Sequence, residues 1–131
     1  MRTNRVTQYN RHNYKLAYEA WLSEGTVARA TAKLKRDGVI NSYGKYYSRD
    51  GMRRAAKCYM VDNYAESKQM LMDNYHRLGY DVSDEDIERY MIKTAITILR
   101  TRDNVTEWLK NNGLYGKHVK FIESMMTIEY D

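Results

Sequence analysis

The residues best suited to chemistry in this sequence are arginines and lysines spaced one helical turn apart. Arg49, Arg53 and Lys57 recur at every fourth position, so in a helix they share one face. The guanidinium fork binds phosphate, and it can donate to O6 and N7 of guanine at the same time. A helix with this face turned outward is predicted to lie in the major groove of double-stranded DNA.

Other basic side chains extend this candidate surface. These side chains lie on the outer face of a predicted helix before residue 38, in the connector of residues 39–47 and in the leader of residues 1–12. The leader could enter a minor groove, as homeodomain arms do. The predicted DNA-binding residues are Arg2, Arg5, Arg29, Lys33, Lys45, Tyr46, Arg49, Arg53, Arg54 and Lys57. The alternative is that this is a solvated basic face on an unrelated helical bundle.

Residues for catalysis or metal binding are sparse and badly spaced. His12, His76 and His118 are far apart, and Cys58 is the only cysteine. The acidic run 84–86, together with Glu88, could suggest Mg²⁺ binding for a nuclease, but carboxylates are also favoured in the first turn of a helix by its unpaired N–H groups. The sequence therefore predicts no enzyme activity, no metal and no cofactor.

The charge is divided unequally along the chain. Residues 1–60 hold 13 Lys and Arg against 4 Asp and Glu, a net charge of +9, whereas residues 61–131 hold 9 against 13, a net charge of −4. A basic front half favours a polyanionic partner, since each phosphate neutralised by a cation releases condensed counterions. The acidic back half suits core completion or contact with protein.

The spacing of apolar residues predicts an all-α protein of five or six helices. There is no proline, and the seven glycines are spread thinly. Near Asn63 the third helix either bends or gives way to another helix. Ser83 and Asp86 have the spacing of a capping box at the start of a helix over 83–99, which we expect to be the most buried element or an oligomer contact.

One segment carries a family resemblance. Residues 24–34, EGTVARATAKL, resemble the G-[ST]-V-x-x-A-A-x-x-L opening of bacterial and phage helix-turn-helix domains, and 48–56, SRDGMRRAA, resemble their recognition helix. The resemblance covers roughly residues 13–62. It implies a DNA-binding domain like those of small phage regulators and terminase small subunits, although the connector 39–47 is longer than the usual turn of about 3–4 residues.

The expected organisation is a basic arm (1–12), a helix-turn-helix-like region (13–62) and a helical core-completing or oligomerisation region (63–131). The expected partners are double-stranded DNA and further copies of the chain, as a dimer or larger oligomer, with no small-molecule ligand. No run approaches the roughly 18 apolar residues of a membrane span, so we expect no membrane contact. With one cysteine and no apolar signal-peptide core, we expect a cytoplasmic protein, in the host cytoplasm if viral.

The competing interpretation is a structural or adaptor protein, for example a phage component, that binds another protein and no DNA. Its partner-binding patch would consist of Ile92, Ile96, Leu99, Trp108 and Phe121. The alternative, which the sequence favours, is that the same residues form the core.

Overall fold

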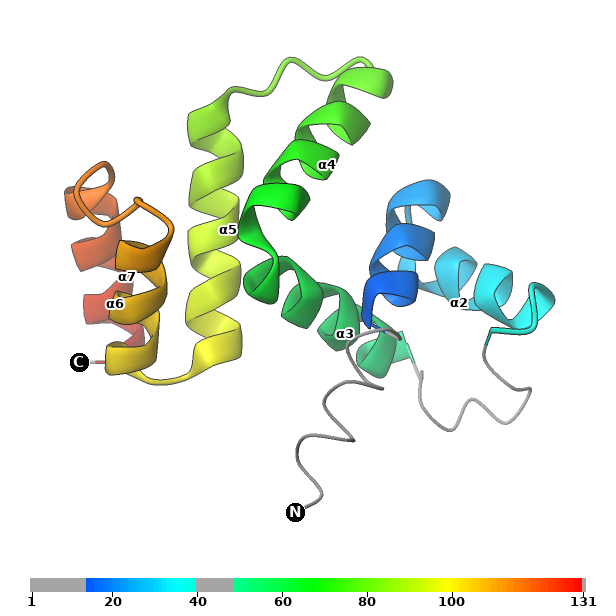
Figure 1. The fold of residues 1–131 in the computed structure, drawn as a ribbon, viewed down its shortest axis with the longest axis horizontal. Helices are drawn as coiled ribbons and strands as arrows, with labels where there is room; N and C mark the ends of the chain where they lie inside the picture. Colours follow the sequence, from blue (N-terminus) through cyan, green and yellow to red (C-terminus); the bar gives the residue numbers. More distant parts are fainter. Residues whose placement is uncertain (1–13, 40–48, 131) are drawn as a thin grey trace. The chain divides into compact units, whose positions relative to one another are not determined.

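The computed structural model describes residues 14–39 and 49–130, and across these ranges the only regular secondary structure is helical (Figure 1). A helix over residues 14–24 comes first. The others are α2 (Val27–Arg36), α3 (Arg49–Asp62), α4 (Tyr64–Arg77), α5 (Asp84–Leu99), α6 (Arg102–Asn111) and α7 (Val119–Tyr130). The predicted all-α class is confirmed. In these ranges no helix is both long and apolar enough to cross a membrane.

The number of helices in the described part of the chain is seven, whereas the sequence predicted five or six. The difference arises partly at Asn63, where a single bent helix was one of the two expected outcomes. Asn63 has φ −131° and ψ 61°, outside the helical region, so α3 ends at Asp62 and α4 begins at Tyr64.

The chain forms two compact units, Met1–Met60 and Val61–Asp131, which we call unit 1 and unit 2. Each unit has its own core. The charge division falls at the same place, because residues 1–60 hold the net charge of +9 and residues 61–131 the net charge of −4.

Unit 1 is built on a core of small side chains shared by three helices. The helix over 14–24 contributes Ala17 and Ala20, α2 contributes Ala30 and Leu34, and α3 contributes Met52 and Ala55. Four of the six buried members are alanines, a residue type that lets helix axes approach each other. Next to this core the rings of Tyr18 and Tyr59 stack with centroids 5.2 Å apart, and both side chains are buried.

The start and end of α2 have clear local causes. Gly25 has φ +77°, a left-handed conformation that suits a residue without Cβ. Thr26 then caps the helix, because its Oγ1 accepts a hydrogen bond from the backbone N–H of Arg29 at 3.2 Å. After α2, Gly38 is again left-handed, with φ +75°. Only Gly25 and Thr26 separate α2 from the preceding helix.

Unit 2 is organised around α5, which packs against α4, α6 and α7. One core cluster joins α5, α6, the α6–α7 connection and α7. The buried members are Ile92, Ile96, Val105, Leu109, Leu114, Ile122 and Met126. Trp108 fixes α6 to the point where α3 ends and α4 begins, since its Nε1 donates to the Val61 carbonyl of α3 at 2.8 Å and its ring packs edge-on against Tyr64 of α4.

This core decides between the two interpretations of one set of residues. Ile92 and Ile96, the first two members of the predicted partner-binding patch, are 0% and 3% exposed. Leu99, Trp108 and Phe121 are half-buried and pack against the same cluster. The patch therefore does not exist as a surface, because its centre is used to hold unit 2 together.

The capping box of α5 is confirmed. Ser83 Oγ accepts from the N–H of Asp86, and Asp86 Oδ2 accepts from the N–H of Ser83, both at 3.2 Å. The expectation that α5 is heavily buried also holds for its inner face, which buries seven residues including Met91 and Ile92.

Removal of this cap has a measurable consequence. We expect Ser83→Ala to lower the free energy of unfolding of unit 2 by about 1 kcal/mol, since the N–H of Asp86 loses its partner. Urea unfolding followed by Trp108 fluorescence measures it. Thr97→Ala, on the exposed side of the same helix, is the control and should cause no loss. Equal unfolding midpoints for Ser83→Ala and the wild type would contradict the role given to the cap.

Candidate nucleic-acid interface

The outer side of α2 carries cations that face water. Its inner side buries Ala30, Thr31 and Leu34, which leaves Arg29 exposed and Lys33 half-buried one turn later. Among the described residues neither cation has a carboxylate within ion-pair distance. Near the end of α2, Arg36 lies 3.9 Å from Glu24, but its side chain is 66% exposed, and such a surface pair contributes only about 0–1 kcal/mol.

The outer side of α3 repeats this arrangement. The helix buries Met52 and Met60, together with Ala55, Ala56 and Tyr59. Arg53 and Arg54 are exposed on the other side, and Lys57 is half-buried one turn beyond Arg53. No carboxylate of the described residues pairs with any of the three. Both basic faces therefore belong to helices that pack on the same core of unit 1.

Several predicted contact residues cannot be placed in this interface. Arg2, Arg5, Lys45 and Tyr46 lie outside the described residues. Arg49 is the first residue of α3, and its side chain is not among those described. The predicted contact residues whose side chains the structure describes are consequently Arg29, Lys33, Arg53, Arg54 and Lys57.

The connection between the two basic helices differs from a helix-turn-helix. α2 ends at Arg36 and α3 begins at Arg49, so residues 37–48 separate them, against a usual turn of about 3–4 residues. The tight connection lies one helix earlier, at Gly25 and Thr26.

No family model, curated protein or solved structure matches this chain.

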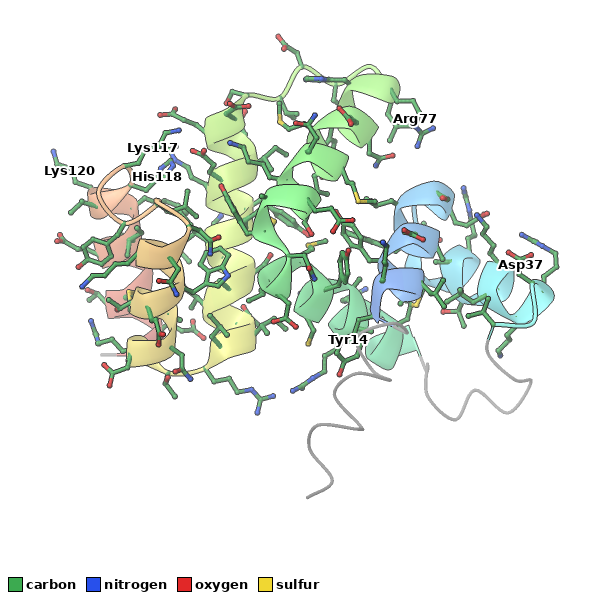
Figure 2. All side chains as sticks on the ribbon, viewed as in Figure 1. Tyr14, Asp37, Arg77, Lys117, His118 and Lys120 are labelled. Carbon is green, nitrogen blue, oxygen red and sulfur yellow. The ribbon has the colours of Figure 1, made fainter. Side chains whose placement is uncertain are left out.

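Unit 2 contains an electrostatic centre of a different kind. Glu88 of α5 is 3% exposed, and its carboxylate binds three nitrogens. His118 Nε2 lies 2.8 Å from Oε1, Lys68 Nζ lies 2.9 Å from Oε2, and Lys117 Nζ lies 3.0 Å from Oε1 and 3.1 Å from Oε2. Figure 2 shows Lys117 and His118 together just before α7. One carboxylate thus connects α4, α5 and the segment that leads into α7.

These contacts determine the protonation of the cluster. Burial would raise the pKa of Glu88, but hydrogen bonds from His118, Lys68 and Lys117 outweigh it and lower the pKa to about 2. The hydrogen bond to Glu88 in turn raises the pKa of Lys117. Burial, and then the nearby carboxylate of Glu88, raise the pKa of Tyr64 to about 12. Glu88 is therefore ionised, and the cluster acts as a charged tie between helices.

Sequence reasoning considered Glu88 only with the acidic residues at the start of a helix and did not predict its buried cluster, although the sequence contains a signal for it. Residues Met91, Ile92 and Ala95, at i+3, i+4 and i+7 from Glu88, are all buried. A carboxylate in the middle of such an apolar stripe must find partners. Among the described residues, no group of three or more His, Cys, Asp or Glu side chains is arranged to hold a metal ion.

Proposed function

We propose that the protein is a non-catalytic binder of double-stranded DNA and that unit 1 makes the contact. The observation that carries the proposal is the set of cations on α2 and α3, which face water on two helices of one core and have no acidic partners among the described residues. A surface that served only to keep the protein hydrated would be hydrated as well by interspersed cations and carboxylates as by cations alone. Here unpaired cations are concentrated on a unit with a net charge of +9.

The chemistry of the α3 face favours DNA over other polyanions. Two of its three described cations are arginines, Arg53 and Arg54, and the guanidinium fork suits phosphate and guanine alike. A helix fits the major groove of B-form DNA in width. This face lies on the side of α3 away from the residues that α3 buries in the core of unit 1.

The biological role that we propose within this function rests on the resemblance of residues 24–34 and 48–56 to bacterial and phage helix-turn-helix domains. We propose either transcription regulation or recognition of DNA during genome packaging, in a phage-type setting and in the cytoplasm. One short recognition helix makes few base contacts, and for that reason such proteins commonly bind as dimers or larger oligomers. We include a homo-oligomer in the proposal.

The test is a fluorescence-anisotropy titration of the full chain on random-sequence duplex DNA over a salt series. The proposal expects log K to fall linearly with log salt, with a slope that corresponds to several neutralised phosphates, about 0.9 per phosphate. A single-stranded competitor of equal length should displace the duplex poorly.

Two results would overturn the proposal. Undetectable binding to the duplex at low salt would mean that the basic faces serve hydration. Tighter binding to single strands than to the duplex would exclude a groove-binding helix as the main contact.

A further inference from the structure

The outer side of α7 carries an apolar stripe. Phe121, Ser124, Met125 and Ile128 follow at i, i+3, i+4 and i+7, the spacing of one helix face. Phe121 and Met125 are half-buried and pack against the core of unit 2 on one flank, whereas Ile128 is 76% exposed. Ser124 is exposed and small, so another helix can approach closely here.

The charges of α7 oppose its own dipole. A helix is stabilised by acids in its first turn and bases in its last turn. α7 has neither. It has instead an exposed cation, Lys120, in the first turn and an exposed carboxylate, Glu129, in the last turn.

Two further cations stand at the Phe121 end of the stripe. The guanidinium of Arg89 lies 5.5 Å and Nζ of Lys93 lies 5.9 Å from the centre of the Phe121 ring, and both project from α5. Among the described residues neither has a carboxylate partner. The stripe therefore has a positive end at Phe121 and a negative end beyond Ile128.

We propose that this stripe pairs with the same stripe of a second copy, with the two α7 helices antiparallel about a two-fold axis. In that arrangement Phe121 faces Ile128 of the second copy, and Ser124 faces Met125 of the second copy. The positive end of each stripe meets Glu129 and the negative helix end of the other, and the symmetry makes this contact twice. A parallel pair would instead place like charges side by side.

The stripe is complementary to itself, and this is the reason for choosing a second copy over another protein. A foreign helix would need its own acidic end and its own apolar spacing, whereas α7 already has both. This inference deepens the proposed homo-oligomer and rests on that part of the proposed function. Its test contains no DNA, so a failure of the interface and a failure of DNA binding are distinguished.

The test measures the mass of the full chain by light scattering during size-exclusion chromatography, from low micromolar to several hundred micromolar protein. We expect a dimer for the wild type. Ile128→Asp should weaken the dimer by about 100-fold or more, because two apolar side chains leave the interface. Its circular dichroism should be unchanged, since Ile128 contributes little to the core. Thr127→Asp adds the same charge at the same end of α7, but at an exposed residue outside the stripe, so it is the matched control and should remain a dimer.

Charge exchange tests the antiparallel arrangement. Glu129→Lys should weaken the dimer by about tenfold, and adding Arg89→Glu and Lys93→Glu to it should restore the dimer. A wild-type monomer at the highest concentration would overturn the proposal. So would an oligomer that Ile128→Asp leaves intact, or a triple variant no tighter than Glu129→Lys alone.

Discussion

Simultaneous replacement of Arg53, Arg54 and Lys57 by alanine is expected to weaken binding to duplex DNA by about 100-fold at moderate salt. These side chains face away from the core of unit 1, so the loss reflects contacts to DNA and not damage to the fold. Alanine also favours helix at all three positions. Each lost phosphate contact should reduce the slope of log K against log salt by about 0.9, for a total of about 2–3.

The matched control removes the same charge from unit 2. Arg77, Arg100 and Lys110 are all exposed there, and their triple alanine variant should keep the slope of the wild type. Circular dichroism of both variants checks that the helices remain. If the two triple variants lose affinity equally, the effect is one of net charge alone, and the α3 face is not the binding surface.

Local sequence signals predicted the parts of the fold that depend on a few neighbouring residues. The start of α5 follows from Ser83 and Asp86, which satisfy each other's backbone N–H groups without help from the rest of the chain. The start of α2 follows in the same way from Gly25 and Thr26. Such signals involve contacts within four residues, so one sequence is sufficient to find them.

Contacts between distant segments were not predictable in the same way. Periodicity shows that Ile92 and Ile96 lie on an apolar face, but it does not show whether a helix of the same chain or a partner covers that face. In the structure α6 and α7 cover it. Likewise, Lys68 and His118 meet Glu88 from 20 and 30 residues away. The exposure of Arg29, Arg53 and Arg54 was predictable, because charged side chains opposite an apolar stripe remain in water.

The largest effect on stability is expected from Glu88→Gln. The variant keeps the size of the side chain but removes the charge that Lys68, Lys117 and His118 surround, and His118 is itself buried. Removal of one partner from a buried charged cluster typically costs about 3–5 kcal/mol. Lys68 and Lys117 can turn towards water, since their side chains are 24% and 50% exposed, so we expect about 3 kcal/mol.

The same residue predicts how unit 2 responds to acid. The pKa of Glu88 falls from 4.5 to about 2 on folding. A carboxyl whose pKa is lowered by folding stabilises the protein above its unfolded pKa, and this contribution disappears as the pH falls through the folded pKa. The free energy of unfolding of the wild type should therefore drop by about 3 kcal/mol between pH about 5 and about 2 through Glu88 alone. Glu88→Gln has no carboxyl group to titrate at this position, so its free energy of unfolding should not show that part of the decline with falling pH.

Trp108 makes this measurement specific to unit 2. Trp21 is the other tryptophan of the chain and belongs to unit 1, so a Trp21→Phe background leaves Trp108 as the only indole. Glu107→Gln, an exposed carboxyl on α6, is the matched control and should change stability by no more than about 0.5 kcal/mol. If Glu88→Gln and Glu107→Gln have the same urea midpoint at neutral pH and the same acid profile, the Glu88 cluster does not tie the helices of unit 2 together.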